Sequence, residues 1–259
     1  MTIIVPDLAQ HLGGWMSSRE LFIRATGDMP HEWQEDYLRE TRDTIVLKGR
    51  QVGASSAGGV IADRYAIYVP GSLVAIVSPS LKQSSEVKER AKGGLLALGV
   101  ELTKDSATEL ALPNRSRILS LPGTAKSVRG WSVDLLIIDE AAFLDQETFV
   151  AARATTAATG GRTIIQSTPM GPFGAFYDIW QDPDPRWAKF QVRSDEVRSI
   201  DPRFLERERD TMTPEKYTQE YEAQFTNPGL GLITPERLAE LTRDLDRPND
   251  NTDPWARLR

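Results

Sequence analysis

The sequence contains no cysteine and only two histidines, His11 and His31, among its 259 residues. Without cysteine there can be no disulfide framework, no thiol nucleophile and no thiolate metal site. The histidines are too few and too isolated to build a histidine-based metal cluster. No apolar run approaches the roughly 18 residues that suggest a membrane span, and the N-terminus lacks the pattern of a signal peptide. We therefore expect a cytoplasmic protein that does not enter a membrane.

The chain also lacks an excess of positive charge. Its 31 Lys and Arg residues face 37 Asp and Glu residues, which gives a net charge of −6. Such a molecule is not a polycation that coats nucleic acid nonspecifically, so any DNA contact must be a local patch. The contents of 40% hydrophobic and 26% charged residues are typical of a soluble globular protein with a core.

Short β-branched runs alternate with longer helical periods, which predicts alternating strands and helices. Strands are predicted at residues 44–49, 72–79, 116–122, 134–140, 162–169 and 189–194, and helices at 55–68, 81–98 and 146–158. Runs such as LVAIV and LLIID are apolar on both faces, as strands of a sheet covered on both sides must be. The pattern predicts an α/β fold with a doubly wound, mostly parallel sheet, helices on both faces, and ligands at the carboxyl ends of the strands.

The segment IVLKGRQVGASS, residues 45–56, is similar to a phosphate-binding loop, or P-loop, of the pattern G-x-x-x-x-G-K-[ST]. Gly53 and Ser55 occupy the positions of the second glycine and the hydroxyl. Ala54, however, stands where the lysine belongs, and Lys48 stands where the first glycine belongs. Glycine and serine after a strand are also ordinary turn chemistry, so this segment alone does not establish a nucleotide site.

A cationic side chain must reach the β- and γ-phosphate oxygens of a nucleotide, but it need not come from the helix side of the loop. Lys48 on the incoming strand or Arg50 in the turn could supply it. Upstream, Gln34 could bond to adenine while Trp33 or Tyr37 packs nearby, although such an aromatic pair is more often only core. The predicted nucleotide-binding residues are Gln34, Lys48, Gly49, Arg50, Gln51, Val52, Gly53, Ala54, Ser55 and Ser56.

Two later strands end in polar residues. The run VDLLIIDEAAF, residues 133–143, ends in Asp139 and Glu140, and adjacent acids there are costly unless solvent, a metal or catalysis holds them. In a P-loop enzyme Asp139 would hold Mg²⁺ with Ser55, and Glu140 would polarise the attacking water. The alternative is a pair of acids opening the next helix. Ser167 and Thr168 end the next predicted strand, where they could sense the γ-phosphate or simply cap a turn.

Together these segments resemble the large terminase subunit of tailed bacteriophages, the ATPase that drives DNA into a procapsid. The resemblance covers roughly residues 30–233. It rests on PHEWQEDYLR, KGRQVGAS, SPSLKQSSEVKERAK, KSVRGWSVDLLIIDEA, QSTP and TPEKYTQEYEAQFTNPG. Some terminases place the phosphate-binding lysine at the start of the loop, where Lys48 stands. Arg129 resembles the family's arginine finger, and Ser167 and Thr168 resemble its coupling motif.

The resemblance implies an ASCE-type P-loop NTPase fold with a small C-terminal helical lid subdomain. It implies ATP and Mg²⁺ as cofactors, with Lys48, Arg129 and Glu140 as catalytic residues. The implied partners are double-stranded viral DNA, a portal protein and a small terminase subunit. Further copies of the chain would form a ring, for example a pentamer, and the isolated chain could be a monomer. The implied location is the cytoplasm of an infected bacterial host.

The expected domains are an N-terminal helical extension at residues 1–29, a P-loop ATPase core at 30–195, the helical lid at 196–229, and a linker or tail at 230–259. Large terminases usually carry a nuclease domain as well, for which too few residues follow. Two alternatives stay open. One is a helicase-like DNA-dependent ATPase, although no second nucleotide-binding-like domain is found. The other is a non-hydrolysing nucleotide-binding scaffold module, which Ala54 suggests.

Local basic patches are expected to contact DNA despite the acidic total. They come from the segments LKQSSEVKERAK and NRSR, although a solvated helix face is the ordinary role for any one such residue. The candidates are Lys82, Lys88, Arg90, Lys92, Arg115 and Arg117.

Overall fold

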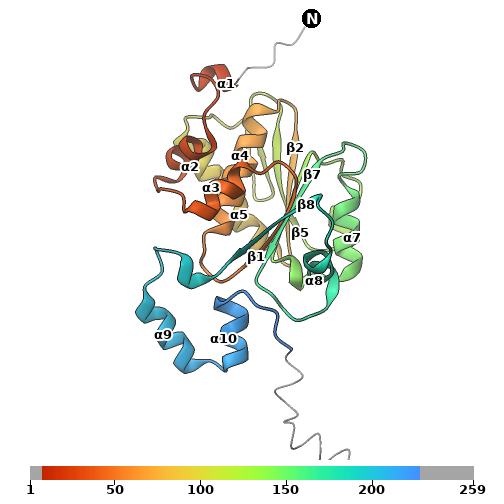
Figure 1. Cartoon of the computed structure of the whole chain (residues 1–259). Helices are drawn as coiled ribbons and strands as arrows, with labels where there is room; N and C mark the ends of the chain where they lie inside the picture. Colours follow the sequence, from red (N-terminus) through yellow and green to blue (C-terminus); the bar gives the residue numbers. More distant parts are fainter. Residues whose placement is uncertain (1–7, 228–259) are drawn as a thin grey trace, which may run out of the picture. The chain divides into compact units, whose positions relative to one another are not determined.

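A single sheet runs through the computed structural model of the protein, which describes residues 8–227 (Figure 1). Its strands are β1 (Asp43–Lys48), β2 (Leu73–Ser78), β3 (Lys104–Asp105), β4 (Glu109–Ala111), β5 (Arg117–Pro122), β6 (Leu135–Asp139), β7 (Arg162–Ser167) and β8 (Trp187–Val192). They lie in the order β3-β4-β5-β2-β6-β7-β1-β8. All neighbours from β5 to β8 pair in parallel, whereas β3, β4 and β5 pair antiparallel. The predicted mostly parallel sheet is confirmed.

The helices alternate with the strands as the apolar pattern predicts. They are α1 (Leu8–His11), α2 (Ser18–Thr26), α3 (Glu32–Arg39), α4 (Ala54–Tyr68), α5 (Leu81–Ala97), α6 (Ala125–Val128), α7 (Gln146–Ala154), α8 (Gly174–Gln181), α9 (Pro202–Thr211) and α10 (Pro214–Tyr221), with short 3₁₀ helices η1 (Ala141–Phe143) and η2 (Ser194–Glu196). The helix predicted at residues 146–158 ends earlier, at Ala154. None of the helices between residues 8 and 227 combines the length and apolar character needed to cross a bilayer.

The two faces of the sheet carry separate hydrophobic cores. Val46 of β1 packs with residues of α4 and α5 in one core, while its neighbour Ile45 packs with Phe149 of α7 and Phe176 of α8 in the other. Figure 1 shows α2 to α5 on one side of the strands, with α7 and α8 on the other. Since successive side chains of a strand point to opposite faces, the two-sided covering explains why the central strands are apolar throughout.

The helices α9 and α10 follow β8 and share a small core of their own, formed by Leu205, Tyr217 and Tyr221. Their placement at residues 202–221 agrees with the helical segment expected after the ATPase core, and residues 8–226 belong to one unit of contacts. The expected domain boundaries at residues 30 and 196 stay predictions. The expected tail at residues 230–259 lies outside the described residues.

Candidate active site

The carboxyl ends of β6, β7 and β1, which are neighbours in the sheet, bring distant parts of the sequence together. The predicted phosphate loop leaves β1, the two adjacent acids end β6, and Ser167 ends β7. Because parallel strands all end at the same edge, motifs separated by more than a hundred residues meet there. This is the edge at which the sequence predicts ligand binding.

The predicted phosphate loop has the backbone shape that its sequence requires. Gln51 has a φ of +60°, and Gly53, the N-cap of α4, has a φ of +85°. A Cβ atom on Gly53 would lie 2.7 Å from Gln34 Nε2, and one on Gly49 would lie 2.7 Å from the Tyr221 carbonyl oxygen. Glycine is therefore needed at both positions. The free N–H groups in the first turn of α4 make the end of this loop a favourable place for an anion.

Lys48 lies inside the site, beside the second of the two acids. Its Nζ atom is 2.8 Å from Glu140 Oε1, and its side chain is only 8% exposed. Glu140 has a φ of +55°, an uncommon conformation for a residue other than glycine, at the turn between β6 and η1. Ser167 Oγ accepts a hydrogen bond from Ala142 N at 3.2 Å and lies 3.4 Å from Glu140 Oε2. Ser167 therefore helps to hold this turn, and Thr168 is buried after it.

Arg50, the other candidate for the phosphate cation, is bound elsewhere. Its Nε atom is 2.5 Å from Glu220 Oε2 of α10, and its backbone N–H donates to the Glu220 carbonyl at 2.8 Å. Its side chain is 58% exposed. Burial raises the pKa of Glu220, but the hydrogen bonds from Arg50 and Lys216 outweigh it, so the pKa is lowered and Glu220 is charged at neutral pH. Arg50 thus joins the loop to α10, a contact that the sequence patterns did not predict.

Asp139 is buried at 5% exposure and makes two side-chain contacts. Its Oδ2 accepts from Ser55 Oγ at 3.3 Å, and its Oδ1 accepts from Gln166 Nε2 at 2.9 Å. Burial raises the pKa of Asp139, Lys48 opposes that rise and Glu140 adds to it. A carboxylate and a hydroxyl side by side suit Mg²⁺, which takes few protein ligands together with phosphate and water. The described residues contain no group of three or more His, Cys, Asp or Glu side chains that could hold a metal by themselves.

Gln34 braces the loop against α3. Its Oε1 accepts from His31 N at 2.9 Å, and its Nε2 donates to the Gly53 carbonyl at 3.1 Å. It is 3% exposed, so most of its side chain is committed to protein contacts. The predicted contact of Gln34 with adenine therefore stays a prediction, while its contact with the loop is observed.

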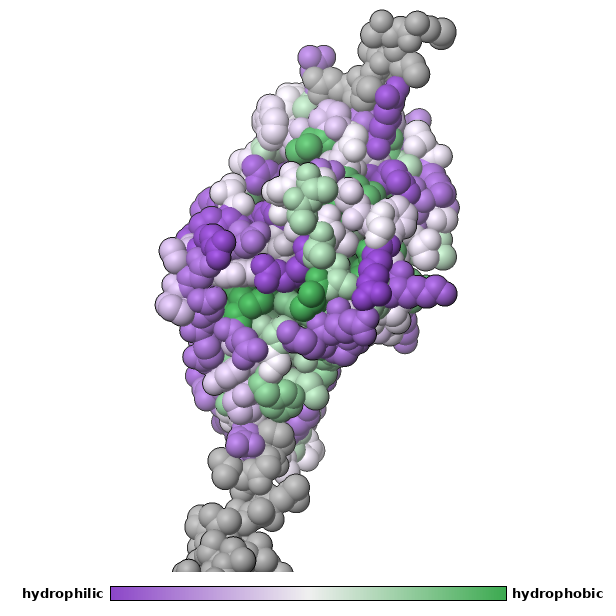
Figure 2. Space-filling model, turned by 90° about the vertical axis from the view of Figure 1, so that its right-hand side faces the viewer, coloured by the Kyte–Doolittle hydropathy of each residue, from purple (hydrophilic) through white to green (hydrophobic). Residues whose placement is uncertain are grey.

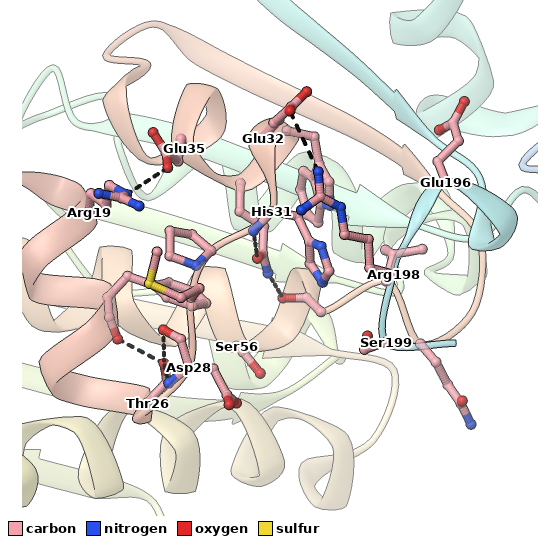
Figure 3. Close-up of a pocket in the computed structure, with 18 residues that line it drawn as sticks. Arg19, Thr26, Asp28, His31, Glu32, Glu35, Ser56, Glu196, Arg198 and Ser199 are labelled. Carbon is pink, nitrogen blue, oxygen red and sulfur yellow. Dashed lines mark hydrogen bonds and ion pairs between the residues drawn. The ribbon is translucent and has the colours of Figure 1, made fainter. Parts of the chain in front are cut away.

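A cavity of about 900 Å³ lies beside the loop on the α3 side. Figure 3 shows the Arg19–Glu35 ion pair at one side of it, with Ser56, His31 and Arg198 around it. It is lined by residues of α2 and α3, the loop residues Gln51, Val52 and Gly53, Ser56 of α4, and Glu196, Arg198 and Ser199 after β8. The cavity adjoins the loop without reaching Lys48 or Asp139, so it can accept the nucleoside part of a ligand whose phosphates lie over the loop.

Arg129 lies outside the cluster formed by Lys48, Asp139 and Glu140. Its Nη2 atom is 2.8 Å from Glu147 Oε1 of α7, and both side chains are largely exposed. Next to this ion pair is a second hollow of about 540 Å³, lined by Trp131 and Val150 among others. Figure 2 shows apolar surface among hydrophilic side chains on the side of the molecule where α7 lies in Figure 1.

One predicted DNA contact is wrong. Lys88 is 1% exposed, and its Nζ atom donates to the Ser106 carbonyl at 2.8 Å and pairs with Glu89 at 2.8 Å. An ammonium held in this way cannot contact DNA. It lies on the buried stripe of α5 with Ser84, Ala91 and Leu95.

The other candidates are at least partly accessible, and three of them are bound by other side chains. Lys92 pairs with Asp105 at 2.6 Å, Arg117 pairs with Glu109 at 2.6 Å, and Arg90 donates to Ser56 Oγ at 2.9 Å. Lys82 and Arg115 are exposed, and neither has a carboxylate partner among residues 8–227. The basic surface is therefore smaller than the sequence suggests.

Two residues of the site were missed as polar contacts. Gln166 of β7 lies between Asp139 and Tyr37, whose hydroxyl donates to Gln166 Oε1 at 3.2 Å. A glutamine inside the apolar run RTIIQS was a signal that the sequence offered, because a polar side chain within a buried strand needs partners. Its partners depend on strand register, which the sequence does not provide.

The sequence matches the family described as "Terminase large subunit, T4likevirus-type, N-terminal" over residues 45–240. A curated relative, the "Terminase, large subunit" of Escherichia phage T5, is 28% identical over 166 residues. That alignment covers 61% of this chain and 38% of the relative, so the chain corresponds to well under two thirds of that protein.

Solved structures show the same fold. The large terminase ATPase domain of Thermus phage P74-26 superposes with a TM-score of 0.71 at 23% identity, over 82% of this chain and all (100%) of that chain. The HK97 bacteriophage large terminase gives 0.59 at 17% identity, over 88% of this chain and 51% of that chain. A large terminase from a thermophilic bacteriophage, solved in complex with ATP-γ-S, gives 0.59 at 13% identity, over 81% of this chain and 52% of that chain.

Proposed function

The chain belongs to the family of the N-terminal part of T4-like terminase large subunits, and from this premise we propose that it is an Mg²⁺-dependent ATPase. In this proposal ATP hydrolysis drives double-stranded DNA into a procapsid. A relative solved as an ATPase domain and another solved with ATP-γ-S support the choice of nucleotide.

One observation carries the proposal: the loop segment 45–56 and the end of β6 meet at one edge of the sheet, where Lys48 contacts Glu140 and Ser55 contacts Asp139. A cation, a hydroxyl and two carboxylates are the groups that phosphoryl transfer needs. An ordinary helix cap would explain Asp139 and Glu140 alone. It would not explain why a buried lysine and the loop serine contact them.

Each residue then has a role. Lys48 binds the β- and γ-phosphate oxygens, and the N–H groups that open α4 bind the same phosphates. Asp139 and Ser55 hold Mg²⁺, which when bound neutralises charge on the transferred phosphate. Glu140 accepts a hydrogen bond from the attacking water and orients it, while Ser167 holds the Glu140 turn. The cavity beside Gln34 receives the base and ribose.

The proposed partners are double-stranded DNA, a portal protein, a small terminase subunit and other copies of this chain in a ring. The family supports them. The proposed place of action is the cytoplasm of an infected bacterial host. Arg129 is proposed to act in the nucleotide site of another copy of the chain. Its guanidinium is exposed and bound to Glu147, outside the cluster of Lys48, Asp139 and Glu140 in its own copy.

The test is phosphate release by the purified chain in Mg²⁺ and in EDTA, with Glu140→Gln as the inactive control. We expect Mg²⁺-dependent release that the variant lacks. Nucleotide binding without release under any condition, including added DNA, would instead identify a non-hydrolysing nucleotide-binding module. An equal rate in Glu140→Gln and the wild type would contradict the proposed site.

A further inference from the structure

A line of buried hydrogen bonds connects α3 to the proposed metal site. The Tyr37 hydroxyl donates to Gln166 Oε1 at 3.2 Å, Gln166 Nε2 donates to Asp139 Oδ1 at 2.9 Å, and Ser55 Oγ donates to Asp139 Oδ2 at 3.3 Å. Tyr37 and Gln166 are both 0% exposed. No part of the proposed hydrolysis uses either of them. Their function must therefore be sought in what they do to Asp139.

Gln166 is held in place by the sheet. It is the register partner of Asp139 on β6 and of Val46 on β1, near the carboxyl end of β7, which lies between those two strands. Its side chain faces α4, where a Cβ atom on Gly58 would come within 3.6 Å of Nε2. Glycine at position 58 leaves room for the amide beside the helix that carries Ser55. The amide therefore has little freedom to leave Asp139.

The hydroxyl of Tyr37 supports the orientation of the Gln166 amide. The Asp139 carboxylate only accepts hydrogen bonds, so it favours the NH₂ end of the amide. Burial raises the pKa of Tyr37, so its hydroxyl stays protonated and can donate to the amide oxygen at the other end. Without that donor, the buried amide oxygen has no partner and the amide is held less firmly against Asp139.

Gln166 and Ser55 donate to different oxygens of Asp139. Ser55 is itself a proposed ligand of Mg²⁺, which it would bind through an oxygen lone pair while its proton still points to Oδ2. Gln166 is the side chain that holds the other oxygen, so its amide keeps Oδ1 in place and leaves Oδ2 on the side of Ser55 and the metal.

We propose that Tyr37 and Gln166 are positioning residues that orient Asp139 for Mg²⁺. Tyr37 also stacks on Trp33, with ring centroids 5.8 Å apart, and Trp33 lines the cavity beside the loop. The relay therefore runs from the wall of the proposed nucleoside pocket to the metal ligand. This inference rests on the proposed function, because it assigns a role toward the proposed metal.

The test is the Mg²⁺ dependence of nucleotide binding, measured with ATP-γ-S at stepped Mg²⁺ concentrations and in EDTA. Tyr37→Phe removes only the hydroxyl. We expect the Mg²⁺ midpoint to rise about 10-fold, as for other residues that orient metal ligands, while binding in EDTA stays close to wild type. The melting temperature should fall no further than in a control variant that loses a different buried tyrosine hydroxyl. Gln166→Leu removes the donor to Asp139 without adding a charge, and its midpoint should rise further.

Tyr68→Phe is the matched control. Tyr68 is also a buried tyrosine whose hydroxyl is hydrogen-bonded, accepting from Met16 N at 3.0 Å, but it lies at the opposite end of α4 from the loop. Equal Mg²⁺ midpoints in wild type, Tyr37→Phe and Tyr68→Phe would overturn the inference and leave the proposed function standing. Failure of the wild type to bind nucleotide, or binding without any Mg²⁺ dependence, would overturn both.

Discussion

The Lys48 ammonium lies 2.8 Å from the Glu140 carboxylate, so the proposed phosphate cation and the proposed catalytic base neutralise each other. Both side chains are largely buried, with 8% and 23% exposure. A carboxylate oxygen held by this ion pair is not free to orient a water molecule. The phosphates of a nucleotide carry more charge than one carboxylate and would compete for Lys48. Nucleotide binding would then free Glu140 for water at the moment when a phosphate is present to be attacked.

This exchange leads to a prediction about Lys48. Lys48→Ala should lower turnover about 10²-fold or more, because the site loses a preorganised cation where charge develops. Arg50→Ala should retain most of the turnover, since the Arg50 guanidinium is bound to Glu220. Steady-state phosphate release from both variants checks this. Near-normal release by Lys48→Ala with a large loss in Arg50→Ala would move the phosphate role to Arg50.

Replacing Asp139 and replacing Glu140 should have different effects on nucleotide binding, because the two side chains contact different partners. Glu140→Gln should still bind Mg·ATP and lose turnover by about 10²-fold, as is usual when a general base is removed. Asp139→Asn should also weaken the Mg²⁺-dependent part of nucleotide binding, because Asp139 is the carboxylate next to Ser55. Binding and turnover are measured on the same preparations. If the two variants behave alike in both assays, the separate roles are wrong.

Asp63 predicts a pH dependence of stability that has nothing to do with the site. It lies on α4 with 0% exposure, and neither carboxyl oxygen has a hydrogen-bond partner among the described residues. Burial raises its pKa well above the usual value. Above the unfolded-state pKa of about 4, the unfolded chain loses this proton while the folded chain keeps it. The folded state binds more protons, so the free energy of unfolding falls as pH rises until the raised pKa is reached.

Asp63→Asn should remove this loss, because the amide is neutral at every pH. The gain in unfolding free energy over wild type should grow by about 1.4 kcal/mol per pH unit above pH 4, up to the raised pKa. Chemical denaturation from pH 4 to pH 8 measures it. Asp210→Asn, at an exposed position on α9, is the control. Parallel pH curves for wild type and Asp63→Asn would contradict the prediction.

How far the sequence predicts this fold depends on the kind of element. The central strands are long, apolar and bounded by turn residues, so their pattern reveals them. The strands β3 and β4 were not predicted, because two or three residues are too few to show a period. The wrong prediction that Lys88 contacts DNA was avoidable. Lys88 lies four residues after Ser84, three before Ala91 and seven before Leu95, which is the spacing of residues on one helix face.

The site shows the same division. The loop and the adjacent acids were identified because each follows a strand, and topology alone brings such positions to one edge. The pairs Lys48–Glu140, Arg50–Glu220 and Tyr37–Gln166 could not be predicted. Each joins residues far apart in the sequence, at separations of 92, 170 and 129. Such contacts depend on strand order and register, and a single sequence does not provide either.

DNA binding should depend on the accessible basic residues and not on the buried one. Replacing Lys82, Arg90 and Arg115 by alanine should weaken binding and reduce its salt dependence by roughly one unit of slope for each lost phosphate contact. Lys88→Met removes the charge and keeps a side chain of similar shape. Because Lys88 is only 1% exposed, DNA affinity should not change. Titrations at several salt concentrations test both. Binding that is insensitive to salt, or that survives the triple replacement, would count against contacts to the DNA backbone.

The position of Arg129 predicts that hydrolysis needs a neighbouring subunit. Its guanidinium is 64% exposed and its partner in the described structure is Glu147 of α7, not a residue of the Lys48 and Glu140 cluster. An arginine finger is worth about 10³ to 10⁵ in rate when it reaches the transferred phosphate. An exposed arginine beside an apolar hollow on α7 is well placed to enter the site of another copy. Isolated subunits should then bind ATP but hydrolyse it slowly, and specific activity should rise with protein concentration.

Mixing two inactive variants gives the sharper test of Arg129. Arg129→Ala subunits keep Glu140, and Glu140→Gln subunits keep Arg129. If the arginine acts across an interface, a mixed assembly contains sites in which an intact Glu140 faces an intact Arg129, so the mixture should recover part of the activity that each variant lacks alone. Glu147→Gln, which releases Arg129 from its partner without removing it, should retain activity and separates the loss of the ion pair from the loss of the arginine. Turnover that is independent of concentration, together with no recovery in the mixture, would mean that Arg129 acts within its own subunit or is only a surface charge.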